Sequence, residues 1–285
     1  MSGEKWRIGD ITVTRVVEIE MAGGLSRFLP DATRDAVKEI GWLQPHFADA
    51  DGRMRGSIHA LIIDTGDARI VVDTCVGNDK VRQIPAWNQM QTGFLDDMAD
   101  AGYPTAAIDA VLCTHLHVDH VGWNTRFEND RWIPTFPNAR YLMGETEYNF
   151  WAARGNDDFF GPVFDDSVKP VFDAGLVDLV QTDHAVAPGV RLVPTPGHTP
   201  GHVSVHISSQ GEEALITGDF LHHPCQIAHP EWCANVDEDS ARAEQTRRDM
   251  FARFADTPAL IIGTHFATPT AGRLVTDGDT YRLDV

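Results

Sequence analysis

The segment that decides the fold of this chain reads Thr114-His115-Leu116-His117-Val118-Asp119-His120. It places three histidines and one carboxylate within six residues, and these two ligand types together suit zinc and similar divalent metals. Alternate side chains of an extended segment share a face, so His115, His117 and Asp119 are expected to converge. A turn after Asp119 would bring His120 to the same place. Because a zinc site with an open position usually takes three protein ligands, four candidates predict two metal ions.

Three more candidate ligands follow in the second half of the chain. Each stands just after an apolar run that predicts a strand: His198 after residues 191–194, Asp219 after residues 214–217, and His265 after residues 259–262. Loops at strand ends, held by a rigid sheet, are where metal sites are usually built. These three side chains supply what a second metal ion would need.

The order of these motifs resembles the five metal motifs of the metallo-β-lactamase superfamily, over about residues 10 to 275. The string His117-Val118-Asp119-His120-Val121-Gly122-Trp123-Asn124 is most similar to the branch that holds acyl-homoserine lactonases and methyl-parathion-hydrolase-like enzymes. The resemblance implies an α/β fold, the four-layer αβ/βα sandwich of the metallo-β-lactamase type. It also implies that Asp73 is the structural aspartate behind the metal loop.

The ligand sets are implied by the same resemblance. His115, His117 and His198 would bind the first ion, Asp119, His120 and His265 the second, and Asp219 would bridge the two. A bound divalent ion lowers the pKa of its water and gives hydroxide near neutral pH, while a second polarises the substrate's carbonyl or phosphoryl oxygen. The expected cofactors are two divalent ions, with Zn²⁺ first and Mn²⁺, Co²⁺ or Fe²⁺ as alternatives. Asp119 is the candidate general base, and a purely structural ligand role is the alternative.

The pattern of apolar runs predicts strands, then helix, then strand, twice. The expected strands span 11–19, 57–64, 68–73, 108–113, 177–180, 190–193, 202–207, 214–217 and 260–262. The expected helices span 31–40, with an Asp cap, then 91–101, 145–153 and 239–255. We expect one domain over residues 1–285, built from two pseudo-symmetric halves of roughly 1–175 and 176–285.

The charge balance weighs against several partner classes, and the alternative is that the acidity only aids solubility. Lys and Arg number 23 and Asp and Glu 42, which gives a formal net charge of −19 at pH 7. Such an acidic surface repels phosphate backbones, so a nucleic-acid partner and the nuclease members of the superfamily are not expected.

The cysteines and the apolar runs bear on location. Cys75, Cys113, Cys225 and Cys233 form no CxxC pair, which is typical of free thiols in a reducing cytosol, although a Cys225–Cys233 disulfide stays open. The start of the chain lacks the apolar stretch of a signal peptide, and no run is long enough to span a bilayer. We therefore expect a cytoplasmic protein without a membrane partner. A homodimer is compatible with the resemblance.

Candidate substrate contacts are His222, His223 and Trp123. The two histidines follow Asp219 closely, and the alternative for either is a loop or ligand-supporting role. Aromatic residues gather from Trp123 to Phe160 and predict an apolar pocket, with ordinary core packing as the alternative. Lactonases of the similar branch use a tyrosine near the metals, whereas no tyrosine lies between His198 and Asp219 or soon after.

These observations predict a dinuclear metal-dependent hydrolase that uses metal-bound hydroxide on a small ester or lactone. Phosphotriesterase or β-lactamase activity at the same site is one alternative, because both reactions need the same hydroxide and charge stabilisation. A non-enzymatic, metal-containing protein that binds a small molecule is the other.

Overall fold

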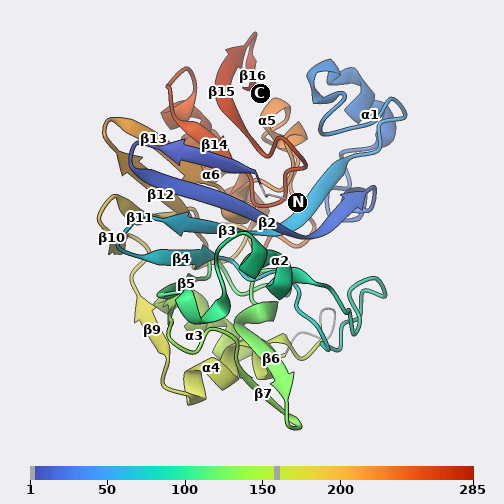
Figure 1. Ribbon diagram of the computed structural model, residues 1–285. Helices are drawn as coiled ribbons and strands as arrows, with labels where there is room; N and C mark the ends of the chain where they lie inside the picture. Colours follow the sequence, from blue (N-terminus) through green and yellow to red (C-terminus); the bar gives the residue numbers. More distant parts are fainter. Residues whose placement is uncertain (1–3, 157–160) are drawn as a thin grey trace. The chain divides into compact units, whose positions relative to one another are not determined.

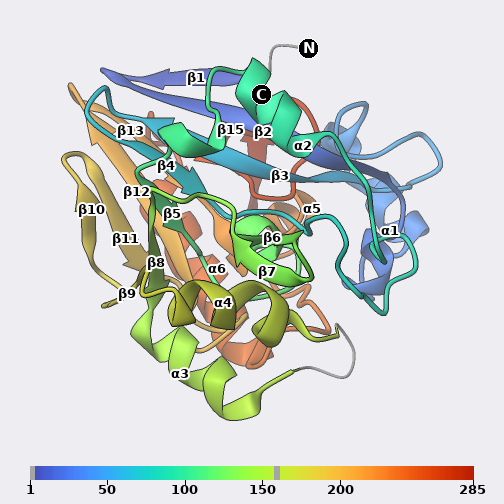
Figure 2. The ribbon, with the colours of Figure 1, turned by 60° about the horizontal axis from the view of Figure 1, so that its bottom comes forward.

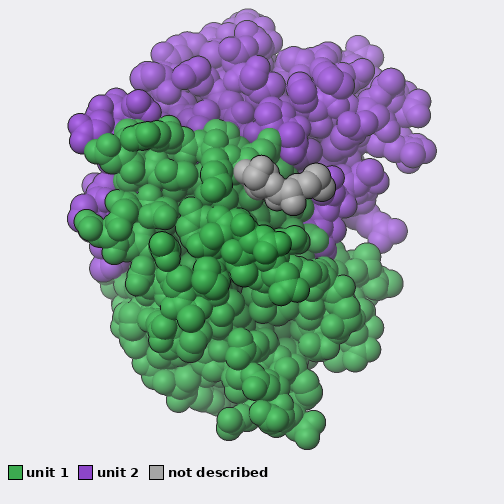
Figure 3. Space-filling view, in the orientation of Figure 1, with its two compact units in different colours: residues 1–18, 58–182 green, residues 19–57, 183–285 purple. Residues whose placement is uncertain are grey.

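The computed structural model describes residues 4–156 and 161–285. The chain divides into two compact units, coloured separately in Figure 3. Unit 1 comprises residues 1–18 and 58–182, and unit 2 comprises residues 19–57 and 183–285. The chain therefore changes unit inside two strands, β2 (Ile11–Ala22) and β3 (Arg55–Asp64), and again after Thr182.

Unit 1 is built on a seven-stranded sheet of order β1-β2-β3-β4-β5-β8-β9 (Figure 1). Its other strands are β1 (Lys5–Ile8), β4 (Arg69–Val72), β5 (Ala110–Leu112), β8 (Arg140–Gly144) and β9 (Val177–Val180). Strands β4, β5, β8 and β9 run parallel, with Val72 opposite Leu112 and Leu112 opposite Leu142. Because parallel strands end at the same edge, the residues that follow β4 and β5 become neighbours.

Helices and a hairpin flank this sheet. The helices are α2 (Phe94–Asp100), α3 (Glu145–Arg154), the π-helix η5 (Phe164–Val168) and α4 (Lys169–Asp173), with short 3-10 turns η3 (Thr105–Ala107) and η4 (Gly122–Asn124). The hairpin pairs β6 (Thr125–Glu128) with β7 (Arg131–Pro134). Helix α3 lies against β8 and β9 (Figure 2).

Unit 2 carries a second seven-stranded sheet whose strands follow sequence order. They are β10 (Ala185–Ala187), β11 (Val190–Pro194), β12 (Val203–Ser209), β13 (Glu212–Ile216), β14 (Leu260–Ile262), β15 (Ala271–Asp277) and β16 (Thr280–Asp284). Only β13 and β14 of these pair in parallel, with Ile216 opposite Ile262. The loops that follow these two strands therefore leave the sheet at the same edge.

The helices of unit 2 pack on an extensive apolar core. They are η1 (Leu25–Arg27), α1 (Arg34–Glu39), η2 (Gly41–Leu43), η6 (Gly218–Phe220), α5 (Cys225–Ala228) and α6 (Ser240–Phe254). Helix α6 buries Phe251 and Phe254 in one cluster with Leu215 and Ile261. Leu29 and Phe47 join the same cluster, which explains why residues 19–57 belong to unit 2.

Most predicted elements are confirmed, with three differences. Strand β9 pairs with β8 in unit 1, whereas it was predicted in the second half. Helix α1 starts later than predicted, because Thr33 rather than Asp31 caps it by accepting a hydrogen bond from the Ala36 amide. Several elements were not predicted: the strands β1, β6, β7, β8, β10, β15 and β16, and the helices η5, α4 and α5.

Two expectations, one about the cysteines and one about membrane spans, can be compared with the structure. All four cysteines are free, so the Cys225–Cys233 disulfide is not formed. Among residues 4–156 and 161–285, no helix is both long and apolar enough to cross a membrane.

Candidate functional site

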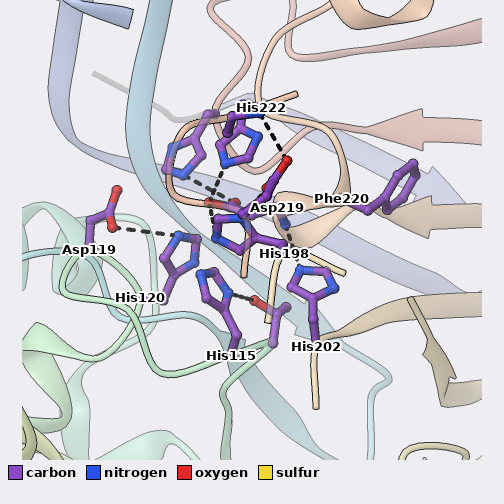
Figure 4. Close-up of polar contacts among 12 residues, drawn as sticks. His115, Asp119, His120, His198, His202, Asp219, Phe220 and His222 are labelled. Carbon is purple, nitrogen blue, oxygen red and sulfur yellow. Dashed lines mark hydrogen bonds and ion pairs between the residues drawn. The ribbon is translucent and has the colours of Figure 1, made fainter. Parts of the chain in front are cut away.

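The quoted histidine motif forms the loop that leaves β5 in unit 1. The loop bends and turns rather than staying extended, and the His120 amide donates to the His117 carbonyl over 3.1 Å. The ring centroids of His115 and His117 lie 4.7 Å apart, and those of His115 and His120 lie 4.0 Å apart. Asp119 places Oδ1 3.7 Å from His120 Nε2 (Figure 4). The structure thus brings the four predicted ligands of this motif together within their own unit.

Asp73 holds this loop from behind. Its Oδ1 accepts the Thr114 amide and its Oδ2 accepts the Thr114 hydroxyl, each over 2.8 Å, and Oδ2 also lies 2.8 Å from His120 Nδ1. The Asp73 side chain is buried, and its backbone φ of 56° lies in the left-handed region that Asp tolerates better than most residues. The parallel pairing of β4 and β5 puts Asp73 there, which agrees with the structural role that the resemblance implies.

A second carboxylate fixes the middle of the loop. Glu147, buried on α3, accepts the Leu116 amide over 3.1 Å and the Trp151 indole N–H over 2.7 Å. The Trp151 ring lies 5.3 Å from the His117 ring. An apolar pocket opens beside His117, and its walls are Leu116, Val118, Trp151, Gly155, Val163, Phe164 and Val168.

The three predicted ligands of unit 2 also meet within their own unit. Asp219, in the turn η6 after β13, directs its two carboxylate oxygens to different histidines. Its Oδ2 lies 3.7 Å from His198 Nε2 (Figure 4). Its Oδ1 lies 3.2 Å from His265 Nε2. His222 also approaches, with Nε2 3.4 Å from Asp219 Oδ2. All four side chains are buried.

Each of these ligands is held by a neighbour in unit 2. His198 Nδ1 lies 2.8 Å from the buried carboxylate of Asp237, and His265 Nδ1 lies 3.1 Å from the Ser57 carbonyl. His202 accepts the Asp219 amide on Nε2 over 2.7 Å and so supports that ligand. Hydrogen bonds of this kind orient metal-binding imidazoles and raise their basicity.

Burial governs the protonation of the side chains around Asp219. It lowers the pKa of His222 to about 3, although the nearby Asp219 charge acts in the opposite direction. Burial likewise raises the pKa of Asp237, against the opposing effects of His222 and Arg247. A neutral imidazole is the form that binds a metal ion.

Two predicted substrate contacts, His223 and Trp123, instead make hydrogen bonds within the protein. His223 Nε2 lies 2.9 Å from the Phe47 carbonyl, and its Nδ1 accepts the Cys225 amide over 3.1 Å. The Trp123 indole N–H donates to Glu18 over 2.6 Å, and its ring stacks on Phe94. Both side chains are buried, so neither has a polar group directed at a substrate in this structure.

Sequence reasoning missed the carboxylates that support the ligands. Asp237 lies 39 positions from His198, and Glu147 lies on a helix separate from the motif. Glu18 accepts the amides of Val76 and Gly77 and fixes the loop after β4. No local sequence pattern marks these residues, because the supporting role of each depends on the element that packs against it. Of the predicted aromatic cluster, Phe159 and Phe160 lie outside the described residues.

Comparison with known proteins places this geometry in a family. An N-acyl homoserine lactonase of Bacillus thuringiensis is 26% identical over 175 residues, a match that covers 57% of this chain. The chain spans only 63% of that lactonase's length.

Solved structures extend the likeness to the whole chain. A structure described as hydrolase AbOPH of the β-lactamase superfamily has a TM-score of 0.81 at 26% identity and covers 100% of this chain and 98% of its own. AidC, described as a dizinc quorum-quenching lactonase, has a TM-score of 0.82 at 22% identity and covers 99% of this chain and 96% of its own. The predicted α/β fold of the metallo-β-lactamase type is therefore confirmed. Residues 53–275 match the family model described as the metallo-β-lactamase superfamily, and the chain belongs to that superfamily.

Proposed function

We propose that this chain is a dinuclear metal-dependent hydrolase acting on a small ester or lactone with an apolar substituent. One observation carries the proposal. Four histidines turn Nδ1 toward an anchoring group of their own unit and so present Nε2 as the donor atom: His115 to Thr114, His120 to Asp73, His198 to Asp237 and His265 to Ser57. Imidazoles held in this way are the usual metal ligands of zinc enzymes.

The donor set fits two divalent ions. The proposed ligands are neutral imidazoles and carboxylates: His115, His117, Asp119, His120, His198, Asp219 and His265. Zn²⁺ is the first choice for such donors, with Mn²⁺, Co²⁺ and Fe²⁺ as alternatives. When bound, the two ions would lower the pKa of water and polarise the carbonyl oxygen under attack.

Asp119 is the proposed proton carrier. Its side chain is partly exposed, whereas the histidines of the same loop are buried, so its carboxylate can reach both a water molecule and a leaving group. A carboxylate in this position would take the proton from the attacking water and pass it to the departing alcohol. This role is compatible with its contact to His120.

The pocket beside His117 supports the choice of substrate class. Its walls carry Trp151, Phe164 and Val168 and present an apolar surface next to a proposed ligand. Pockets of this kind bind the apolar part of a ligand while a few polar groups fix its orientation. An apolar wall at this place favours an acyl or aromatic group over a charged one, and the relatives named as N-acyl homoserine lactonases make acyl lactones the first compounds to test.

Proton release from a substrate panel tests the proposal. The zinc- or manganese-loaded protein is assayed on lactones, aryl esters, β-lactams and phosphotriesters, each with and without a chelator. We expect chelator-sensitive turnover of lactones or esters. His117→Ala and Asp119→Ala should lower that turnover by at least about 100-fold, the scale of a lost acid–base group. His229→Ala, at an exposed histidine beside Glu231, is the control and should leave it unchanged.

Other outcomes select among the alternatives. Preferential turnover of phosphotriesters or β-lactams would keep the metal centre and replace the substrate class. Full activity of both variants on the preferred substrate would refute the proposed centre. Tight binding of a small molecule without turnover would instead support a binding protein.

A further inference from the structure

His222 is a buried histidine whose polar atoms are not explained by hydrogen bonds. It follows the turn η6, is 5% exposed, and neither ring nitrogen has a hydrogen-bond partner among residues 4–156 and 161–285. A buried polar group left in this state is costly, so such groups call for a specific explanation. The next residue, His223, shows the contrast, because backbone groups satisfy both of its ring nitrogens.

The surroundings of His222 are those of a metal ligand. Its Nε2 lies 3.4 Å from Asp219 Oδ2, and His198 Nε2 lies 3.7 Å from the same oxygen. Ligand atoms that share one tetrahedral zinc ion, with bonds of about 2.0–2.1 Å, stand about 3.3 Å apart. His198, Asp219 and His222 also form a group whose three donor atoms all lie within 4.8 Å of one another.

The two oxygens of Asp219 separate this group from His265. Oδ1 faces His265 Nε2 at 3.2 Å, whereas Oδ2 faces His198 and His222. The His198 and His222 rings meet at 72° with centroids 4.8 Å apart, while the rings of His222 and His265 are nearly parallel at 6.3 Å. His222 therefore belongs with His198 on the Oδ2 side.

We propose that His222 is a metal ligand, which with His198 and Asp219 Oδ2 gives unit 2 a three-ligand site of its own for one divalent ion. The inference rests on the proposed metal-dependent function and adds an eighth ligand to the seven of that proposal. The ion on the Oδ2 side gains a donor, so it should be held more tightly than the ion on the Oδ1 side. Substrate contact is the competing role for His222, and it predicts no change in metal affinity on substitution.

Metal binding to a His222→Phe variant tests the assignment, because phenylalanine keeps a ring and removes both nitrogens. Zinc content is measured after equilibration against a chelator of known affinity, and the visible spectrum is recorded with Co²⁺ in place of zinc. We expect two zinc ions per wild-type chain. In the variant, one of them should bind at least about tenfold more weakly, since even loss of a supporting residue costs 10–100-fold, and the cobalt spectrum should change.

The controls separate ligand loss from general damage. His206→Phe makes the same substitution on β12, at a half-buried histidine that pairs with Glu213, and should leave both readouts unchanged. His222→Gln supplies a smaller perturbation if the phenyl ring disturbs folding, and thermal unfolding of each variant reports on that directly.

The possible failures are distinguishable. A wild-type chain that binds no zinc would overturn the proposed function and this inference together. Two ions in the wild type, with unchanged affinity and cobalt spectrum in both His222 variants, would overturn only the ligand assignment. If turnover were lost in that second case, His222 would be a substrate contact.

Discussion

At the scale of single residues, the candidate site depends on carboxylates that never need to touch a substrate. The side chains of Asp73 in unit 1 and Asp237 in unit 2 are both buried, and each carboxylate lies 2.8 Å from the Nδ1 of a proposed ligand. A carboxylate behind an imidazole fixes the ring and its tautomer, so that Nε2 carries the lone pair. The positions of the ligand side chains are thus fixed by residues that do not themselves bind the metal.

Asp73→Asn tests this dependence in unit 1. The amide would place an N–H₂ group against donors, because Asp73 now accepts from the amide and hydroxyl of Thr114 and faces His120 Nδ1. We expect metal affinity to fall by about 10–100-fold with the protein still folded. Competition with a chromophoric chelator measures the affinity.

Asp109→Asn is the matched control. Asp109 stands before β5, where its carboxylate accepts the Arg69 amide over 2.8 Å, in unit 1 but at the opposite end of the strand from the motif. It should bind metal as the wild type does. Equal affinities for Asp73→Asn and Asp109→Asn would show that Asp73 does not orient a ligand.

The sequence alone suggests the candidate ligands, but it does not reveal the residues that orient them. Seven ligand candidates stand out because they lie in short motifs directly after apolar runs. Nothing in the sequence separates His222 from His223, since the turn after Asp219 alone decides which ring faces that carboxylate. Asp237 could not be found either, because only tertiary packing brings it to His198.

At the scale of elements, the turn after the histidine motif is fixed by a close backbone approach. The Gly122 amide donates to the Cys75 carbonyl over 2.8 Å, and a Cβ on Gly122 would lie 1.8 Å from the Val76 carbonyl oxygen. Only a residue without a side chain fits this contact. It ties η4 to the loop after β4, which also carries Asp73.

Gly122→Ala should therefore destabilise the fold. The backbone must shift to relieve the overlap, and overpacking of this kind typically costs about 1–3 kcal/mol in the free energy of unfolding. Gly41→Ala is the control, because a Cβ there meets nothing within 4 Å and the backbone φ is not positive, so stability should stay nearly unchanged or rise slightly. Urea denaturation compares both variants with the wild type, and equal midpoints for all three would contradict the predicted overlap.

Elements with a run of apolar residues were predictable, whereas short strands were missed, even β8 between β5 and β9. Strand β3 is buried along nearly its whole length and reads as a long apolar run, which is the pattern of a strand covered on both faces. Strand β16 has only five residues at the edge of its sheet, and the two strands of the hairpin β6–β7 have four residues each and are mostly part-buried or exposed. Such short strands carry few apolar residues in succession, which is too weak a signal to distinguish them from loops.

At the scale of the whole molecule, two cationic side chains are buried although the chain is strongly acidic. The chain carries a net charge of −19, yet Lys80 and Arg82 are buried in unit 1 around a single carboxylate. Arg82 pairs with Asp166 on the π-helix η5 over 2.6 Å, and Lys80 Nζ lies 3.6 Å from the same carboxylate and 3.6 Å from the centre of the Trp132 ring. This cluster joins the loop after β4 to the helix that lines the pocket beside His117.

Burial of Lys80 should make the stability of the protein depend on pH. Burial lowers the pKa of Lys80 from 10.5 to about 7, although Asp166 opposes the shift. Between these two values the unfolded chain binds a proton that the folded chain lacks, so the free energy of unfolding should rise with pH. The contribution of this one group approaches about 1.4 kcal/mol per pH unit.

Lys80→Met isolates that contribution. Methionine keeps an unbranched side chain that is one atom shorter, removes the titrating group and leaves the Arg82–Asp166 pair in place. Urea denaturation from about pH 7 to 8.5, below the ordinary range of the buried thiols, should show a smaller slope for the variant than for the wild type. Lys38→Met, at an exposed lysine of α1 paired with Asp35, should keep the wild-type slope. A Lys80→Met slope equal to that of the wild type would mean that Lys80 stays charged in the folded protein, held by Asp166 and the Trp132 ring.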